Sequence, residues 1–321
     1  MSITRRGLAG AAAILAARGA AAQGFPNRPI TLVVPFAAGS STDVVGRQAA
    51  RALSEALGQG AVVENRTGAG GIIGTQAVAR ARPDGHTLLI VTNSTHAANK
   101  ALFRALPYDP VADFAPISNL ATGPLVLLCH PSVPARTLGE LIAHGRANPG
   151  KLTYGYSGSS SQIAAVMLVD AARIEAVGVP YRSIPPTVTD LLGGQLSFTF
   201  ADPGNALPYI RSGQAIGLGV TSPARTALAP DIPSLAEAGL SGFDLAPWQG
   251  IAAPAGTDPA VVGRIFDALR ARYDTPEVRQ TYAALGFEVT LSASPAAYAG
   301  FIRAETDRWG DLVRQARIEP Q

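Results

Sequence analysis

The sequence predicts an α/β protein of two lobes, each a mostly parallel sheet flanked by helices, with a ligand cleft between the lobes. Strand-like runs rich in β-branched residues alternate with helix-like periodic segments along most of the chain. Such alternation is typical of βαβ units, which build parallel sheets with right-handed crossovers. The chain has 321 residues, of which 47% are apolar, enough to fill the cores of about two domains.

The alternation runs in two series, and these give the expected bounds of the lobes. We expect the chain to cross between the lobes near residues 120–125 and again near residues 245–253. The first lobe then comprises residues 23–122 and 246–321, and the second lobe comprises residues 123–245.

Residues 1–22 have the features of an export signal that is cleaved near Ala22. Arg5 and Arg6 precede a short apolar stretch over residues 7–17, which is too short to span a bilayer. Small residues follow that stretch, as they do before a cleavage site. The arginine pair also fits a twin-arginine signal, and an ordinary secretory signal fits equally well. The mature chain is therefore expected to be exported.

The charge of the mature chain gives no indication of a nucleic acid or membrane partner. The full chain has 26 basic and 23 acidic residues. The signal segment holds three arginines and no acidic residue, so 23 of each remain and the net charge is zero. The single cysteine, Cys129, lies in an apolar run, which predicts a buried strand residue and no disulfide within the chain.

The first lobe is expected to contain three strands, each followed by a helix, because β-branched runs alternate with segments of helical spacing. The strands are predicted over residues 30–36, 60–65 and 86–93. The helices are predicted over residues 42–57, 70–81 and 95–103.

The same logic continues in the second lobe, and the chain then ends in helices. Strands are predicted over residues 123–131, 152–157, 177–182, 196–202 and 215–222. Helices are predicted between them over residues 137–148, 160–172, 185–194 and 205–213. The final helices are predicted over residues 258–273, 276–286 and 294–316.

The loop after the first strand is a candidate anion site, because ligands of such sheets bind beyond the carboxyl ends of the strands. Gly39 allows a tight turn, and the polar residues after it are of the types that cap helices. The free N–H groups of a helix start favour an anion. The alternative is that these residues only cap their own helix. The candidate residues are Phe36, Ala38, Gly39, Ser40, Thr42 and Asp43.

A second glycine-rich loop, over residues 65–74, does not fit a nucleotide-binding motif. The dinucleotide pattern would require glycine where Ile73 stands, and neither Lys100 nor Lys151 lies in a P-loop pattern. No cofactor is therefore predicted. The loop still opens a helix, so it can hold a smaller anion or serve as a purely structural turn. The candidate residues are Gly68, Ala69 and Gly70.

Two further polar loops follow strands and can donate hydrogen bonds to a carboxylate. The serine-rich loop is not a nucleophile elbow, because that motif requires glycine where Ser159 stands. The four histidines show no metal-ligand spacing. No catalytic or metal residue is therefore predicted. The candidate binding residues are Asn93, Ser94 and Thr95 in one loop and Ser157, Gly158, Ser159 and Ser160 in the other.

Asp202 follows another strand and offers an acceptor for an amino, hydroxyl or water group, or else a cap for the next helix. Arg182 is the one cation at a strand end. Phe36, Tyr181 and Trp248 are aromatic candidates for the cleft or for the core. Together the loops predict a binding site for a small anion, without a catalytic triad.

Several motifs of this chain resemble the Bug proteins, the periplasmic solute-binding components of tripartite tricarboxylate transporters. They include RPITLVVPFAAGSSTDVVGR, VVENRTGAGGIIGTQAVARARPDGHTLL and APAGTDP, and they cover almost the whole mature chain in order. The resemblance implies a type II periplasmic binding fold that closes over an organic carboxylate. It also implies a monomer that passes its ligand to the large and small membrane subunits of the transporter, with neither catalysis nor cofactor.

The resemblance further implies that the two glycine-rich loops hold the carboxylate, partly through waters, while Ser159, Ser160 and Asp202 supply the opposite jaw. The chain departs from the family pattern at three positions. Ser40 and Ser183 stand where glycine is usual, and Gln162 stands where histidine is frequent.

Two other functions remain open at this point. A sensory binding protein, which presents its ligand to a membrane receptor, would have the same cleft. An exported hydrolase would use a serine near Ser157.

Overall fold

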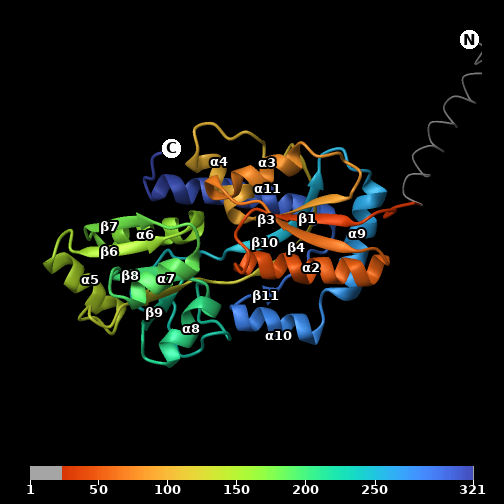
Figure 1. Cartoon of the computed structure of the whole chain (residues 1–321). Coiled ribbons are helices and arrows are strands. Elements are labelled where there is room, and N and C mark those ends of the chain that lie inside the picture. Colours follow the sequence, from red (N-terminus) through yellow and green to blue (C-terminus); the bar gives the residue numbers. More distant parts are fainter. Residues whose placement is uncertain (1–23, 321) are drawn as a thin grey trace, which may run out of the picture.

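The computed structural model describes residues 24–320, and within them two sheets flanked by helices lie side by side (Figure 1). The predicted signal over residues 1–22 lies outside the described residues. The order of the first sheet is β11–β4–β10–β3–β1–β2 and that of the second is β7–β6–β8–β5–β9. The predicted α/β class with two lobes is confirmed.

The first sheet gathers strands from both ends of the chain. Its strands are β1 (Ile30–Val34), β2 (Ala61–Asn65), β3 (Thr87–Thr92), β4 (Phe114–Thr122), β10 (Trp248–Pro254) and β11 (Glu288–Val289). The helices of this lobe are α2 (Ser41–Leu57), α3 (Ile72–Ala79), α4 (Asn99–Leu102), α9 (Pro259–Arg272), α10 (Pro276–Leu285) and α11 (Pro295–Gln315), with short turns η1 (Ala69–Gly71) and η2 (Ser94–Ala98).

The second sheet is built from the middle of the chain. Its strands are β5 (Val126–Cys129), β6 (Leu152–Tyr156), β7 (Ala176–Pro180), β8 (Phe198–Ala201) and β9 (Ile216–Val220). The helices of this lobe are α5 (Leu138–Ala147), α6 (Gly158–Ala172), α7 (Ile184–Leu192) and α8 (Pro203–Arg211).

The sheets are mixed rather than mostly parallel. The βαβ units are parallel as predicted, with β1 between β2 and β3, and with β6 between β7 and β8. However, β10 runs antiparallel to β3 and β4, and β5 runs antiparallel to β8 and β9. These antiparallel strands lie at the ends of the two crossings. The chain passes from β4 to β5 at the first crossing and from β9 back to β10 at the second.

The crossing segments are longer in regular structure than the sequence predicts. Residues 114–122 and 248–254 form the strands β4 and β10, whereas the sequence indicated only a connection there. The backbone N–H of Gly123 donates to the carbonyl of Pro247 at 3.1 Å, so the two crossings lie side by side. The bounds of the lobes at 122/123 and 245/246 remain a prediction.

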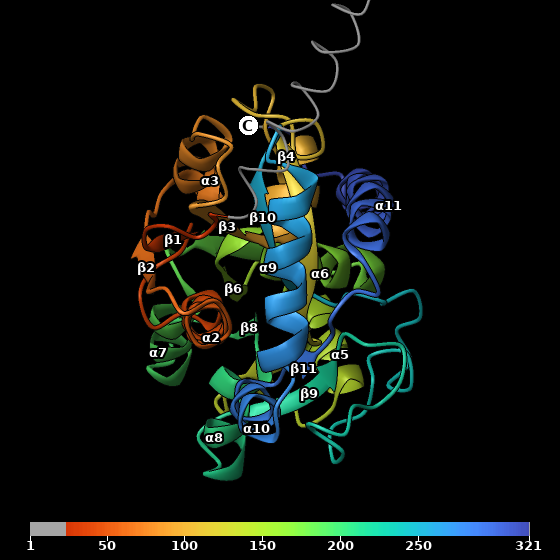
Figure 2. The ribbon, with the colours of Figure 1, turned by 90° about the vertical axis from the view of Figure 1, so that its right-hand side faces the viewer.

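The strand β1 shows why the first sheet is covered on both faces. Ile30, Leu32 and Val34 pack into the cluster beneath α2 and α9, whereas Val33 joins the cluster on the other face. This alternation is the period of two of a strand. Figure 2 shows α9 in front of the sheet, with α2 and α11 to either side.

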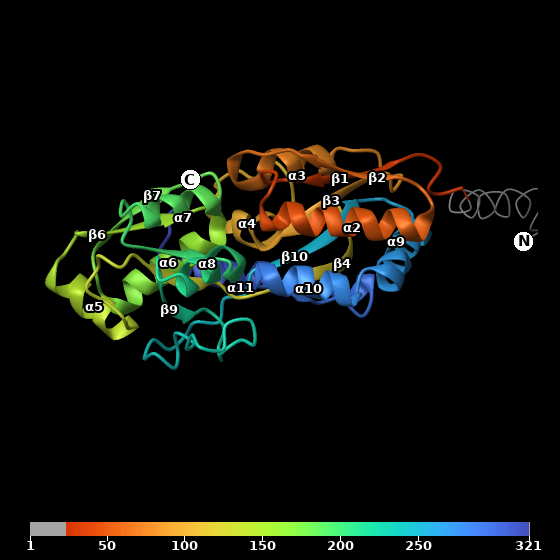
Figure 3. The same cartoon turned by 60° about the horizontal axis from the view of Figure 1, so that its bottom comes forward.

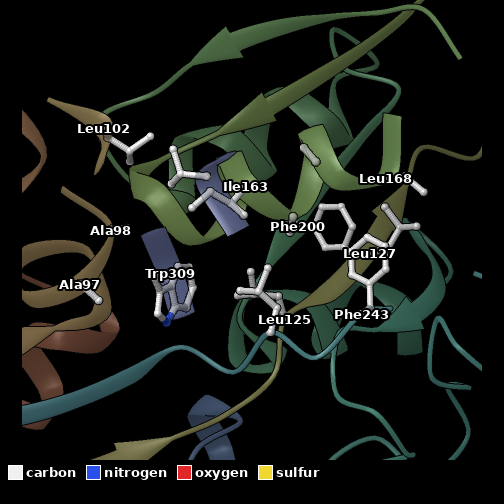
Figure 4. Packing of buried hydrophobic residues seen from close by; sticks show 14 of the residues in the cluster. Ala97, Ala98, Leu102, Leu125, Leu127, Ile163, Leu168, Phe200, Phe243 and Trp309 are labelled. Atoms are coloured by element: carbon white, nitrogen blue, oxygen red, sulfur yellow. The ribbon is translucent and has the colours of Figure 1, made fainter. Parts of the chain in front are cut away.

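Apolar packing is continuous from one lobe to the other on the side of α11. Trp309 of α11 belongs to the same buried cluster as Leu125, Ile163 and Phe200 of the second lobe, and Figure 4 shows these side chains together. Cys129 is also buried in this cluster, as the sequence predicts, and burial raises the pKa of its thiol to about 12. Figure 3 shows a further contact between the lobes, where α10 lies against α8.

No helix among the described residues has the length and apolar character that crossing a membrane requires.

Candidate functional site

A cavity of about 110 Å³ lies between the two sheets, at the ends of the strands that face the other lobe. The loops after β1 and β3 and the start of β10 line it from the first lobe, and the loops after β6, β7 and β8 line it from the second. Its polar lining residues are Ser40, Ser41, Thr42, Thr92, Asn93, Ser94, Ser157, Ser160, Ser161, Arg182, Ser183, Asp202, Asn205 and Gln249.

The loop between β1 and α2 presents the start of α2 to the cavity. Gly39 has a φ of 81°, a conformation that favours glycine. Ser40 is the N-cap of α2, and its hydroxyl accepts the backbone N–H of Asp43 at 3.2 Å. The hydroxyl hydrogen of Ser40 is therefore still available to a ligand. Ser41 and Thr42 line the cavity next to it.

Asp43 supports this loop from behind and does not line the cavity. Its carboxylate accepts the N–H of Gly39 at 3.0 Å, Nε of Arg47 at 2.9 Å and Nδ2 of Asn65 at 2.9 Å. Burial alone would raise the pKa of Asp43, but these hydrogen bonds outweigh it, so the pKa is lowered. Asn65 also donates to the carbonyl of Phe36 at 3.0 Å, so the loop is held on both sides.

The loop after β3 reaches across to the serine-rich loop after β6. Nδ2 of Asn93 donates to the hydroxyl of Ser160 at 2.7 Å. The hydroxyl of Ser159 donates to that of Ser94 at 2.7 Å. Thr95 is fully buried and pairs with Thr92 instead, because its hydroxyl accepts the backbone N–H of Thr92 at 3.1 Å.

The serine-rich loop is held by its own hydrogen bonds. The hydroxyl of Ser161 accepts the N–H of Ser157 at 2.8 Å and donates to the carbonyl of Ser157 at 2.9 Å. Ser157 is the N-cap of α6 and makes no side-chain cap bond. Its hydroxyl and the first turn of α6 therefore face the cavity with groups that can bind an anion.

Asp202 is the one carboxylate of the cavity and lies 9% exposed at the start of α8. Burial raises its pKa to about 6, against weaker lowering effects of hydrogen bonds from Ser41 and Asn205. The hydroxyl of Ser41 donates to Oδ2 of Asp202 at 3.4 Å. This is a third side-chain hydrogen bond across the cavity between the lobes, so the cleft is closed.

The second glycine-rich loop does not line the cavity. Its carbonyl at Gly70 accepts Nδ2 of Asn99 at 3.1 Å, which ties the loop to the end of η2.

The structure thus divides the predicted site residues into two groups. Those that line the cavity are Phe36, Ser40, Thr42, Asn93, Ser94, Ser157, Gly158, Ser160 and Asp202. Those that do not are Ala38, Gly39, Asp43, Gly68, Ala69, Gly70, Thr95 and Ser159.

Besides Arg182, six polar lining residues are not among the predicted binding residues: Ser41, Thr92, Ser161, Ser183, Asn205 and Gln249. Ser41 lies within the predicted loop and differs from its neighbours by no sequence signal. Gln249 lies on β10, a strand that the sequence reading treated as a crossing. Its neighbour Trp248, an aromatic candidate for the cleft or the core, is buried in the core. The indole of Trp248 donates to Oε2 of Glu305 at 2.8 Å.

The described lining of the cavity does not contain a serine–histidine pair. None of the four histidines is among the lining residues, so no serine of the cavity has a histidine beside it. The carboxylate of Asp202 accepts the hydroxyl of Ser41. The part of the chain that the structure describes contains no group of three or more residues suited to hold a metal ion.

The fold and the closed, polar cleft define a two-lobed solute-binding protein. A family model described as the tripartite tricarboxylate transporter family receptor matches residues 45–318. The chain belongs to this family.

Relatives of known sequence agree along nearly the whole chain. A protein of Pseudomonas sp. strain P51, described as the UPF0065 protein in the tcbD-tcbE intergenic region, is 37% identical over 98% of this chain and 95% of its own length. Protein BugT of Bordetella pertussis is 36% identical over 91% of this chain and 90% of its own length.

Solved structures share the fold closely. The periplasmic binding protein BugD has a TM-score of 0.86 at 33% identity and covers 92% of this chain and 100% of its own. Rpa4515 of Rhodopseudomonas palustris, solved with adipate, has a TM-score of 0.87 at 32% identity. The match covers 92% of this chain and 100% of Rpa4515. MatC of the same organism, solved with bound malate, has a TM-score of 0.84 at 34% identity. The match covers 90% of this chain and 100% of MatC.

Proposed function

We propose that the protein is a periplasmic receptor that captures a small organic carboxylate by closing its two lobes. It then presents the closed complex to the large and small membrane subunits of a tripartite tricarboxylate transporter. The observation that carries the proposal is a cavity between the lobes lined by hydroxyl, amide and helix-start donors from both sides. Such a site gains its closing free energy from a ligand that contacts both lobes.

The charge of the cavity favours a small anion. Its neutral donors are serine and threonine hydroxyls and the amide of Asn93, and the starts of α2 and α6 add oriented N–H groups. Arg182 is the one cation among the lining residues. The adipate and malate in the two solved relatives are carboxylates, which supports the same ligand class here.

In this proposal the predicted residues that line the cavity contact the ligand, and the others support them. Asp43 fixes the first loop, and Ser159 holds Ser94 in place across the cleft. The loop over residues 68–70 does not line the cavity, and a contact of this loop with the ligand through waters rests on the resemblance to the family alone.

The receptor acts without catalysis and reaches the periplasm through the export signal over residues 1–22. Membership of a receptor family supports the absence of catalysis. Two solved relatives are described as a periplasmic transporter and a periplasmic binding protein, which supports the location.

A thermal-shift screen tests the proposal. The panel contains di- and tricarboxylates, hydroxy acids, amino acids and aromatic acids, with their amides and esters as controls. A ligand at about 100 times its Kd stabilises the folded state by about 2.7 kcal/mol, which raises the Tm by several degrees. We expect a shift with at least one acid and none with its amide. Silence of all acids, with protein stripped of ligand by unfolding and refolding, would contradict the proposal.

A further inference from the structure

Gln249 occupies a rigid position at the end of the cavity that is next to the crossings. It is the second residue of β10 and pairs with Thr92 of β3 on one side and Ala121 of β4 on the other. The register with β4 shifts between Gln249 and Gly250, and such irregularities re-aim side chains beside binding sites. Trp248 points to α11, so the alternation of the strand turns Gln249 to the cavity.

The amide of Gln249 has no hydrogen-bond partner among residues 24–320, which the structure describes. The residue is 4% exposed, and its Oε1 is buried without a partner. No described residue bonds its Nε2 either. Buried polar groups of native proteins almost always have a hydrogen-bond partner. An amide that lacks one in the lining of a cavity is therefore expected to bond a ligand group in that cavity. A carboxamide offers two donors and an acceptor.

The order of the strands separates Gln249 from the cation of the cavity. In the first sheet β10 lies beyond β3 and β1, toward the crossings. Arg182 follows β7, the outermost strand of the second sheet on the side away from β5. The hydroxyl and amide donors after β1, β3 and β6 lie between these two ends.

Apolar residues line this end of the cavity beside the amide of Gln249. Leu125, Pro247 and Phe287 also line the cavity, and they belong to the crossings or to the segment before β11. An acid with an apolar tail would fill this end but leave the buried amide unpaired, which costs free energy. A second carboxylate at this end would accept a hydrogen bond from Nε2 of Gln249, and a hydroxyl group could also donate to its Oε1.

We propose that Gln249 is a specificity-determining residue that hydrogen-bonds a second oxygen group of the ligand, so that the protein prefers dicarboxylates and hydroxy acids over unsubstituted monocarboxylates of equal length. The inference rests on the proposed function of the same cavity. It goes further because it assigns a role to a residue outside the loops that hold the first carboxylate.

Isothermal titration calorimetry on the full chain tests the inference with acids of matched length. The probes are hexanoate, 6-hydroxyhexanoate and adipate, and butanoate, succinate and malate. We expect the wild-type protein to bind the best bifunctional acid at least about tenfold more tightly than the matched monocarboxylate, the factor of a hydrogen bond of ordinary strength. This comparison needs no variant.

Two variants of similar size locate the effect. Gln249→Met removes the amide and should weaken the bifunctional acid about tenfold while the matched monocarboxylate changes less than twofold. Gln249→Glu adds a negative charge and should weaken dicarboxylates further. The control is Gln195→Glu, which adds the same charge at an exposed position outside the cavity and should change neither affinity.

The outcomes separate the inference from the proposed function. If no acid binds the wild-type protein, both are overturned. If acids bind but monocarboxylates bind as tightly as bifunctional acids, the carboxylate receptor stands and the role of Gln249 is overturned. The same holds if Gln249→Met lowers the affinity of both acids equally or lowers only the Tm of the ligand-free protein, since the amide then has a structural role.

Discussion

Asp202 gives the cavity a charge that depends on pH in the physiological range. Its carboxyl is buried at the start of α8, and its pKa is raised to about 6. A bound carboxylate disfavours a second negative charge in the same cavity. Binding of an anion is therefore coupled to protonation of Asp202 in our proposal.

We predict that affinity for the acid increases as the pH falls from 8 to 6, by up to about tenfold per pH unit, the limit for uptake of one proton. Calorimetry at half-unit intervals above pH 5.5, where the ligand stays ionised, measures this slope. Arg182 is the other charged lining residue. The Asp202→Asn variant should give a flat profile, and an unchanged slope in that variant would rule out Asp202 as the titrating group.

The same shift has a consequence for stability, with the opposite sign to that of Asp43. A raised carboxyl pKa means that the folded state holds its proton longer than the unfolded state, so Asp202 lowers the free energy of unfolding as the pH rises from about 4 to above 6. Asp43 has a lowered pKa. Its contribution is present above about pH 4 and is lost as the pH falls through the folded-state value.

Replacing Asp43 with Ala should reduce the free energy of unfolding by about 1–3 kcal/mol, because Asn65 and Gly39 lose a buried acceptor. Urea unfolding at pH 7 and pH 3 measures the loss, which should shrink at the lower pH. Arg47→Ala is the control. The guanidinium is exposed, so its removal should cost clearly less, and an equal cost would show that the ion pair rather than the loop bonds is responsible.

At the scale of elements, the sequence predicted the helices better than the strands near the crossings. The sequence predicts the start of α2 because Gly39 and Ser40 are turn and capping residues, and apolar residues at helical spacing follow them. The strands β4 and β10 were missed, because a chain passing between lobes and an antiparallel strand in the interior of a mixed sheet carry the same apolar signature. That error also concealed Gln249, since no loop after a parallel strand contains it.

The sequence also could not show which polar loop residues face the cavity. Ser159 and Ser160 are neighbours of the same type, yet Ser159 is buried against Ser94 whereas Ser160 lines the cavity. Only the helical phase of α6 decides between them. Asp43 likewise carries the signature of an anion loop but turns its carboxylate away from the cavity to Gly39 and Asn65.

The helix α11 fixes the returning crossing through one buried carboxylate. Oε2 of Glu305 accepts the indole N–H groups of Trp248 and Trp309, each at 2.8 Å. Its Oε1 accepts Nη1 of Arg308 at 3.0 Å, and Arg308 also pairs with Asp244 at 3.1 Å. The start of β10 is thus held to α11 just before Gln249.

Glu305→Ala should cost roughly 3 kcal/mol of unfolding free energy, because two buried indole donors and a guanidinium lose their acceptor. The chain has only two tryptophans, so their fluorescence reports on this cluster directly. We expect a changed emission maximum together with a lower Tm. Glu277→Ala, on the exposed side of α10, is the control and should change neither. A Glu305→Ala protein of wild-type Tm would contradict the anchoring role.

At the scale of the whole molecule, three side-chain hydrogen bonds join the lobes across the cavity. The contact of α10 with α8, the pair of Arg308 with Asp244 and the apolar packing beside α11 join them elsewhere. The bonds link Ser41 to Asp202, Asn93 to Ser160 and Ser94 to Ser159. Each is a single polar contact of modest strength. We infer that the closed state is stabilised by these bonds together with a ligand that contacts both jaws.

Small-angle X-ray scattering should show this stabilisation as a smaller radius of gyration with the acid than without it. Ser94→Ala with Ser159→Ala removes one of the three bonds and should enlarge the difference between the two states. An identical radius with and without saturating acid would mean that closure does not depend on the ligand.

The central claim is that the cavity between the lobes is a receptor site for a carboxylate, and calorimetric titration with an acid and its uncharged amide tests it most directly. The acid that gives the largest thermal shift is titrated into the full chain, followed by its amide, which keeps the size and most of the shape. We predict a saturable site of one acid per chain and no measurable binding of the amide. Equal binding of acid and amide would contradict the claim, because the donors of the cavity would then not be recognising a negative charge.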